Sequence, residues 1–219
     1  MYLFPNVVIF DNKQKQMKYP EFKKALKNKT IFTYNDIRKI TPTFHRRQLV
    51  EWQKAGYITK IRNGYYCFSD YEKNEQLLYH FANQLYKPSY ISLASAMAYY
   101  NLIPEAVFNI TSVSTLKTTK FDTPYGRFEY KNIKPSLFFG YQLQTNNSFT
   151  LKIAEPEKMI LDYCYLLKPT NIQDFESLRI NKEEMIKLIN INKFDIYLSV
   201  YKSPAMNHRA NMFKIYINA

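Results

Sequence analysis

Glycine and cysteine are scarce in this sequence of 219 residues, and each shortage excludes a class of protein. The four glycines are scattered, so the chain has no glycine-rich loop to cradle a nucleotide phosphate. Two cysteines, Cys67 and Cys164, are too few for a disulfide framework, and nothing indicates an oxidising compartment. No apolar run approaches the length of a membrane span. We therefore expect a cytoplasmic protein with no membrane partner.

Residues that could carry catalysis are few and widely separated. The three histidines lack the spacing of metal ligands or of a catalytic triad: His45, His80 and His208. The strongest catalytic pattern is Asp122 followed by Glu129-Tyr-Lys131. In many metal-dependent nucleases, acidic residues in such a pattern bind Mg²⁺, and a lysine is positioned beside them. We favour the alternative, in which Glu129 and Lys131 are the outward residues of an alternating strand. The sequence therefore predicts a protein that is not an enzyme, with no catalytic residue, metal site or cofactor.

Positive charge is concentrated in the first third of the chain. The whole chain has a net charge of +13. Residues 1–70 contain 14 lysines and arginines against 5 acidic residues, a net +9, whereas residues 71–219 contain 17 against 13, a net +4. This asymmetry indicates a polyanionic partner for the N-terminal region. A soluble protein with a solvated basic face is the alternative.

The first 72 residues have the pattern of a helical module that ends in a hairpin. Helices are expected over residues 19–28, 33–40 and 44–56, and strands over residues 57–62 and 65–69. Thr33 suits the N-cap of the second helix, and Asp36 completes a capping box. Gly56 ends the third helix, and Asn63-Gly64 is the strongest short signal for a hairpin turn. Three helices followed by a hairpin is the outline of a winged helix-turn-helix.

The third helix has one apolar and one polar face. Leu49 and Trp52 lie on the apolar side with His45, so we expect this histidine to be packed and partly buried. The opposite face carries Thr43, Arg46, Arg47, Val50 and Lys54. In a helix-turn-helix the N-terminal end of this helix enters the major groove, where an arginine can donate two hydrogen bonds to guanine O6 and N7. The alternative is that these charges are solvated surface residues.

Basic residues also flank the hairpin turn. Lys60 and Arg62 precede Asn63-Gly64, at the place where a wing contacts the DNA backbone or minor groove. Such contacts supply salt-dependent affinity more than sequence choice. The predicted DNA-binding residues are Thr43, Arg46, Arg47, Lys54, Lys60, Arg62, Asn63 and Gly64.

After the hairpin the pattern changes to mixed helices and strands, so the expected fold class is α+β. Residues 73–87 are predicted to form a helix that links the module to residues 88–219. Strands are expected over residues 109–116, 126–133, 136–143 and 149–155, with a turn at 145–147. Helices are expected over residues 92–102, 155–168, 182–190 and 193–202, with Pro204 interrupting the tail. Ser92 suits an N-cap, and Lys158 and Asp162, four residues apart, are expected to pair on a helix surface.

Several segments resemble one family. "RQLVEWQKAGYITKIRNGYY" is similar to the N-terminal winged helix of AbiEi-type antitoxins, which belong to type IV toxin–antitoxin, or abortive-infection, systems. The more specific segments are "PSYISLASAMAYYNLIPE", "NITSVSTLKTTKFDTPYGRFEYKNI", "LFFGY" and "IAEPEKMILDYCYLL". They occur in the order and approximate spacing of that family, and the resemblance covers about residues 19–168. Residues 1–16 lie outside it, and we expect them to be a packed or strand-pairing extension. The alternative is non-native upstream sequence, because Met17 opens a more natural start for a helix.

The resemblance implies a phage-defence function. It implies a winged-helix DNA-binding domain joined to an α/β antitoxin domain, here residues 88–219. Such proteins are transcriptional regulators that repress their own operon by binding inverted repeats in the double-stranded DNA of its promoter. They also neutralise a cognate nucleotidyltransferase-like toxin, directly or indirectly. By matching positions, Arg46, Arg47 and the tip from Arg62 to Gly64 take the DNA-binding role.

One further class of function remains open from the residues alone. Aromatic side chains are abundant in the second half and could line the pocket of a ligand-sensing winged-helix transcription factor. They are Tyr99, Tyr100, Phe138, Phe139 and Tyr141. Such residues more often belong to a protein core.

Overall fold

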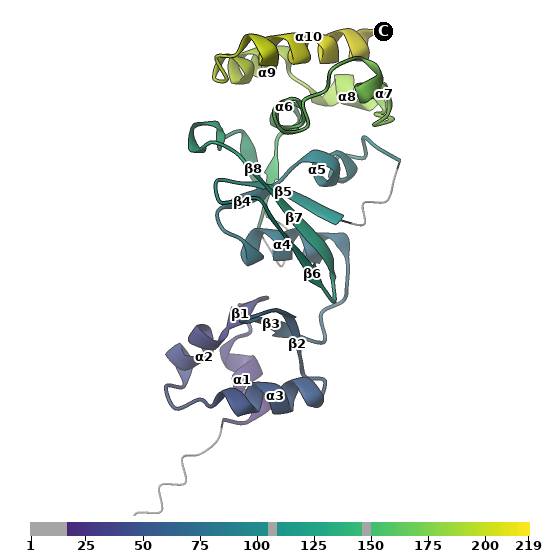
Figure 1. Ribbon diagram of the computed structural model, residues 1–219. Helices are drawn as coiled ribbons and strands as arrows, with labels where there is room; N and C mark the ends of the chain where they lie inside the picture. Colours follow the sequence, from purple (N-terminus) through teal and green to yellow (C-terminus); the bar gives the residue numbers. More distant parts are fainter. Residues whose placement is uncertain (1–16, 105–108, 146–149) are drawn as a thin grey trace, which may run out of the picture. The chain divides into compact units, whose positions relative to one another are not determined.

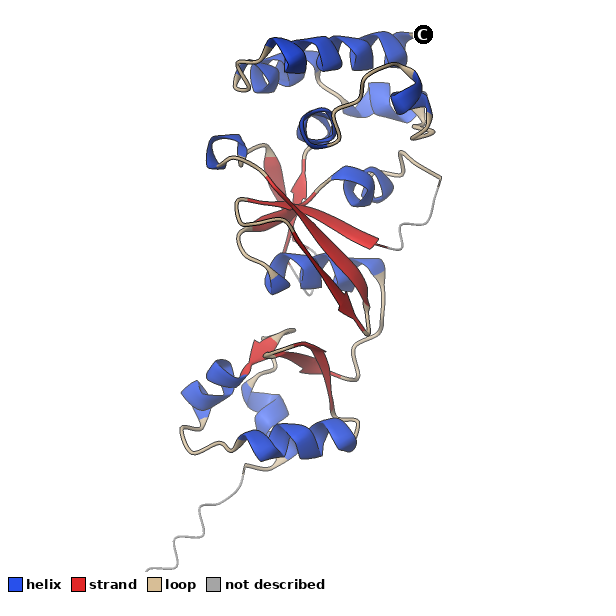
Figure 2. Ribbon diagram, in the orientation of Figure 1, coloured by secondary structure: helices blue, strands red, loops and turns tan. Residues whose placement is uncertain are grey.

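The computed structural model describes residues 17–104, 109–145 and 150–219, which fold as two compact units (Figure 1). The first unit ends at Tyr71 and the second runs from Glu72 to Ala219. Each unit combines helices with its own sheet, so the α+β fold class is confirmed (Figure 2). The expected extension over residues 1–16 and most of the expected turn at 145–147 lie outside the described residues.

From residue 17 to Tyr71, the first unit contains three helices and a small antiparallel sheet. In chain order its elements are α1 (Tyr19–Ala25), β1 (Phe32–Thr33), α2 (Tyr34–Ile40), α3 (Arg46–Lys54), β2 (Ile58–Arg62) and β3 (Tyr65–Phe68). The sheet order is β1-β3-β2, so the two-residue strand β1 adds to the free edge of the hairpin. The sequence predicted the helices and the hairpin but not β1.

Local chemistry fixes the ends of α2 and α3. At α2, Thr33 Oγ1 accepts a hydrogen bond from the Asp36 amide at 3.3 Å, and Asp36 Oδ2 accepts one from the Thr33 amide at 2.9 Å. The predicted capping box is therefore confirmed. At the end of α3, Gly56 adopts a φ of 72°, and the Tyr57 amide donates to the carbonyl oxygen of Trp52 at 2.9 Å. This is a Schellman motif, in which glycine accommodates the left-handed turn.

Aromatic rings fill the core of the first unit. The ring centroids of Phe22 and Trp52 are 4.4 Å apart, and those of Phe22 and Phe32 are 5.3 Å apart. Phe44 and Leu49 complete the contact between α3 and this cluster. This packing fixes the orientation of α3, because its inward residues are locked among large rings.

The expectation of a packed His45 is wrong. His45 is exposed, and the residue before it, Phe44, is buried instead. The reason is that α3 begins at Arg46, and His45 is its N-cap with extended backbone angles (φ −95°, ψ 132°). The helical period used to assign faces therefore begins only at Arg46, one residue after His45.

The second unit is built on a mixed sheet. Its strands are β4 (Ser89–Ile91), β5 (Asn109–Ser114), β6 (Thr119–Thr123), β7 (Gly126–Asn132), β8 (Tyr141–Thr145) and β9 (Thr150–Ala154). Among the described residues, the strand order is β6-β7-β5-β4-β9-β8. The pairs β5–β7 and β4–β9 are parallel, and the other pairs are antiparallel.

Helices cover both faces of this sheet. Helix α4 (Glu75–Leu85) packs against β4, β5 and β9, and α5 (Leu93–Tyr99) lies on the opposite face with α6 (Pro156–Leu166) (Figure 1). The helix expected to link two domains is therefore part of the core of the second unit, because it buries Leu77, Phe81 and Leu85 against the sheet.

The chain ends in a helical layer that packs on α6. It consists of α7 (Gln173–Glu176), α8 (Lys182–Leu188), α9 (Ile191–Ser199) and α10 (Pro204–Asn218). Pro204 was expected to interrupt the tail, but it begins α10. Proline is favoured in the first helical turn, where its missing N–H costs nothing, and Ser203 caps the same end.

The expected strand over residues 136–143 is also wrong. The chain instead makes a 3₁₀ turn, η1 (Pro135–Leu137), and β8 begins only at Tyr141. Gly140 has a φ of 67°, and a Cβ atom built on it would lie 3.0 Å from Lys158 Cβ. Glycine is therefore required here for both conformation and space. Strands β4 and β6 were not predicted.

Candidate nucleic-acid interface

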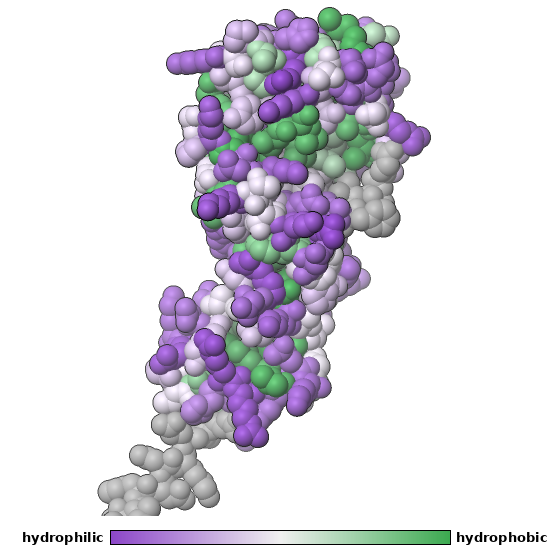
Figure 3. Space-filling model, viewed as in Figure 1, coloured by the Kyte–Doolittle hydropathy of each residue, from purple (hydrophilic) through white to green (hydrophobic). Residues whose placement is uncertain are grey.

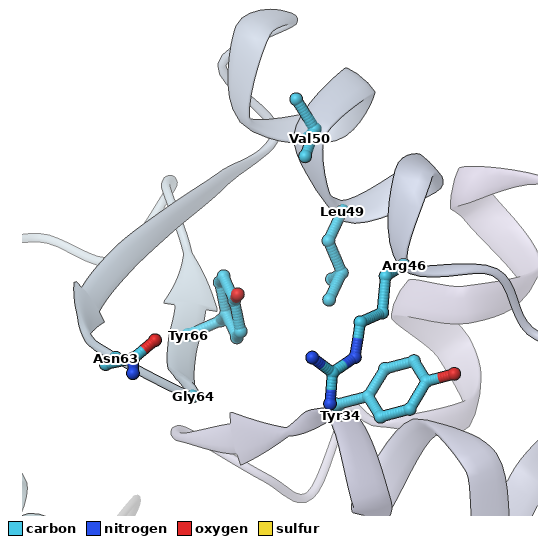
Figure 4. A pocket seen from close by; sticks show the side chains of 7 residues that line it. All are labelled: Tyr34, Arg46, Leu49, Val50, Asn63, Gly64 and Tyr66. Carbon is cyan, nitrogen blue, oxygen red and sulfur yellow. The ribbon is translucent and has the colours of Figure 1, made fainter.

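A groove separates the N-terminal part of α3 from the tip of the β2–β3 hairpin. Its volume is about 340 Å³ (Figure 4). It is lined by Tyr34, Arg46, Leu49, Val50, Asn63, Gly64 and Tyr66. The structure thus brings together three residues that the sequence predicted for one site, namely Arg46, Asn63 and Gly64. They come from two elements that the aromatic core holds in place.

Arg46 is held on an aromatic ring. Its guanidinium carbon, Cζ, lies 4.6 Å from the centroid of the Tyr34 ring, a cation–π contact visible in Figure 4. The Tyr34 hydroxyl donates to the Phe44 carbonyl oxygen at 3.0 Å, which fixes the ring. Stacking uses the flat face of the guanidinium and leaves its N–H edge to donate hydrogen bonds. The first turn of α3 therefore presents a planar donor in a defined orientation.

Arg47 forms an exposed ion pair within α3. Its Nε donates to Glu51 Oε1 at 3.1 Å, one turn along α3, and its side chain is 89% exposed. Exposed ion pairs of this kind are weak and exchange easily with other partners. Arg47 is therefore available to an anion.

The other predicted residues lie outside the lining of the groove. Thr43, Lys54 and Lys60 are exposed. Arg62 is half-buried, with its Cζ 4.3 Å from the Tyr65 ring centroid at the base of the hairpin tip. The register of β2 and β3 shifts between Lys60 and Arg62, which is a bulge next to the turn. Hydrophilic side chains cover most of the visible surface of the first unit (Figure 3).

The predicted site lacked four residues of the groove. Two of them, Leu49 and Val50, belong to α3, and the other two are Tyr34 and Tyr66. Tyr34 begins α2, and Tyr66 pairs across the sheet with Phe32, so only the folded chain places both beside Arg46. The sequence carried only a weak signal for Tyr66, which follows Gly64 of the turn by two residues.

The second unit contains a buried ion pair rather than the expected surface pair. Lys158 and Asp162 bond to each other, and both side chains are 0% exposed. Asp162 Oδ2 accepts hydrogen bonds from the Tyr90 hydroxyl at 2.9 Å and from Ser92 Oγ at 2.8 Å. The Lys158 ammonium also donates to the Tyr201 hydroxyl at 3.1 Å. The pairing was predicted, but its surface location was wrong, because the C-terminal helices cover α6.

This network ties together the sheet, α6 and the C-terminal layer. Burial raises the pKa of the Asp162 carboxyl and lowers the pKa of the Lys158 ammonium, while their mutual attraction acts in the opposite direction. Ser92 is the N-cap residue of α5 but bonds to Asp162 instead of capping the helix. Since no solvent reaches the pair, the arrangement is structural.

The residues of the nuclease-like pattern do not form one site. Glu129 and Lys131 line a surface groove of about 370 Å³ with Lys120, but Asp122 is not part of that lining. The Asp122 carboxylate accepts a hydrogen bond from Arg127 Nε at 2.6 Å. Across the described ranges 17–104, 109–145 and 150–219, no group of three or more His, Cys, Asp or Glu side chains is placed to hold a metal ion.

The aromatic residues considered for a ligand pocket pack against one another and their neighbours. The Tyr90 and Tyr141 rings are stacked at 5.1 Å, and Phe138 lies 5.1 Å from Tyr90. The Tyr100 hydroxyl donates to the Ala154 carbonyl oxygen at 2.8 Å. In the described part of the chain, no helix has both the length and the apolar character needed to cross a bilayer.

Comparison with protein-family models and with curated proteins finds no match for this chain.

Proposed function

We propose that the first unit is a winged helix-turn-helix that binds double-stranded DNA. Helices α2 and α3 form the helix-turn-helix, α3 enters the major groove, and the β2–β3 hairpin is the wing. The observation that carries the proposal is the position of Arg46, which is stacked on Tyr34 at the first turn of α3 and faces the hairpin tip across the groove. A planar, oriented donor at that place suits the O6 and N7 atoms of guanine.

Charge supports the same proposal. Residues 1–70 carry a net charge of +9, and Arg47 and Lys54 of α3 and Lys60 of β2 are exposed. Phosphate contacts by such residues release counterions, so binding weakens as salt rises. The alternative, a basic face that is only solvated, accounts for the charge. It does not account for an arginine stacked on a tyrosine or for the hairpin beside it.

We further propose that the protein is an antitoxin that represses its own operon. In this proposal it binds inverted repeats in its promoter and counters a nucleotidyltransferase-like toxin encoded nearby. The support is the resemblance of the segments in the second unit. The first and last of these segments in the second unit meet in one buried network, with Tyr90 and Ser92 from the first and Lys158 and Asp162 from the last.

DNA binding is tested with the full-length protein and the DNA upstream of its gene. Fluorescence anisotropy should give tighter binding to this duplex than to a shuffled duplex of the same composition, with a difference that persists as salt is raised. Equal affinity for the two duplexes at every salt concentration would contradict sequence-specific binding.

Neutralisation is tested by co-expression with the product of a neighbouring nucleotidyltransferase-like gene. We expect the full-length protein to restore growth, and the double variant Arg46→Ala/Arg47→Ala to restore it equally while losing operator repression. Continued growth arrest with folded wild-type protein present would reject the antitoxin role and leave the DNA-binding proposal standing.

A further inference from the structure

The outward face of α3 carries an apolar side chain among its charges. Val50 is 50% exposed and lies one helical turn after Arg46, and both line the same groove (Figure 4). Isolated exposed apolar residues are common on proteins, so exposure alone indicates nothing. The position is informative, because Val50 shares a reading face with an oriented arginine.

We propose, on the premise of the DNA docking above, that Val50 contacts the C5-methyl group of a thymine while Arg46 bonds to a nearby guanine. The thymine methyl group is the apolar feature that base pairs display in the major groove, and aliphatic side chains contact it there. Valine suits this contact because its branched Cβ has one strongly preferred rotamer in a helix, which holds both methyl groups in fixed positions.

Helix geometry limits the spacing of the two bases. Residues four apart are neighbours on one face of a helix, separated by about 6 Å along the axis at roughly 1.5 Å per residue. Bases of one strand are stacked at about 3.4 Å. The guanine and the thymine therefore lie within about two base-pair steps of each other in each half-site.

The rest of the groove favours this assignment. Leu49 is buried and lines the same groove, so Val50 has an apolar neighbour on the groove wall. Tyr34 holds the arginine, so the two contacts are fixed relative to each other by one rigid helix. The ligand is thus duplex DNA whose half-site contains a guanine and a 5-methylpyrimidine at this spacing.

The test replaces thymine by uracil, which removes only the methyl group. Full-length protein is titrated with the upstream duplex and with versions carrying one uracil in each half-site, at constant salt. We expect one position at which uracil weakens wild-type binding by about fourfold, the effect of burying one methyl-sized group. Val50→Ala should bind the thymine and uracil duplexes equally. Val200→Ala, which changes an exposed valine of the second unit, should keep the uracil effect.

The experiment distinguishes failure of the thymine contact from failure of DNA binding. If wild-type protein binds the operator specifically but no uracil position has an effect, the thymine contact is refuted and the DNA docking stands. If Val50→Ala keeps the uracil effect, or changes the oligomeric state in size-exclusion chromatography instead, Val50 does not read the methyl group. If wild-type protein binds no duplex, the proposed function itself fails.

Discussion

The guanidinium of Arg46 is stacked on the ring of Tyr34, with Cζ 4.6 Å from the ring centroid, although the two residues belong to different helices. The tyrosine is itself fixed by its hydrogen bond to the Phe44 carbonyl oxygen. Orientation of the arginine therefore depends on the turn between α2 and α3 as well as on α3 itself.

Arg46→Ala should weaken operator binding and relax sequence choice. A bidentate arginine–guanine contact discriminates by about 1–3 kcal/mol, so the operator should lose most of its advantage over a shuffled duplex. Arg47→Ala should weaken binding in the same assay, and Tyr34→Leu should lose part of the discrimination because the arginine is no longer held. Undiminished discrimination in the Arg46→Ala/Arg47→Ala double variant would refute the docking.

Lys60→Ala should weaken binding to operator and shuffled DNA alike. In the proposed docking this exposed lysine of the wing would contact phosphate, so its loss should lower the slope of log affinity against log salt by about 1. Lys187→Ala is the matched control, because Lys187 is an exposed lysine of the second unit. A change in sequence preference with an unaltered salt slope would assign Lys60 to base reading instead. Arg62→Ala should also weaken binding to operator and shuffled DNA alike. It should lower the stability of the first unit as well, because the contact with the Tyr65 ring is lost.

Lys158→Met should strongly destabilise the second unit. The substitution leaves the Asp162 carboxylate buried without its cation, and breaking a buried pair in this way costs about 3–5 kcal/mol. Adding Asp162→Asn removes the uncompensated charge and keeps an acceptor for Tyr90 and Ser92, so the double variant should recover much of the loss. Urea unfolding followed by circular dichroism measures both changes. Equal stability of wild type and Lys158→Met would refute a paired, buried lysine.

The stability of the first unit should depend on pH through Asp36. Burial alone would raise the pKa of this carboxyl, but hydrogen bonds from Lys29 and Thr33 lower it below its ordinary value. The folded state therefore favours the ionised form, and this stabilisation is present above the unfolded pKa of about 3.9 and lost as pH falls through the folded value. Asp36→Asn should thus cost more stability at pH 7 than at pH 2.5.

The stability of the first unit at each pH can be measured by the fluorescence of Trp52. It is the single tryptophan of the chain and lies in the core of the first unit, so its fluorescence reports unfolding of that unit. Glu21→Gln is the control, since Glu21 is an exposed acidic residue in the first turn of α1. A cost of Asp36→Asn that is the same at both pH values would show that the ionised form has no special role.

Several features of the fold could be predicted because they depend on contacts between residues that are close in the sequence. The capping box of Thr33 and Asp36, the glycine stop at Gly56 and the Asn63-Gly64 hairpin each involve residues within a few positions of one another. Their hydrogen bonds join residues that are close in the sequence, so the local pattern is enough to recognise them. The same holds for the spacing of Lys158 and Asp162, which a helix alone brings together.

Other features depend on long-range contacts. Strand β4 has only three residues, and β1 only two, so their patterns are too short to recognise, and pairing with distant strands creates them. Gly140, which follows the 3₁₀ turn, passes closely over Lys158. No spacing within residues 136–143 reveals that neighbour.

The sequence by itself determined the basic N-terminal module, the direction of the outward face of α3 and the position of the hairpin tip. Only the tertiary structure decided that Tyr34 and Tyr66 join Arg46 in one groove, and that Lys158 and Asp162 are buried rather than exposed. Helical and strand periods specify which residues of one element share a face. They contain no information about what packs on that face, which the fold of the whole unit supplies.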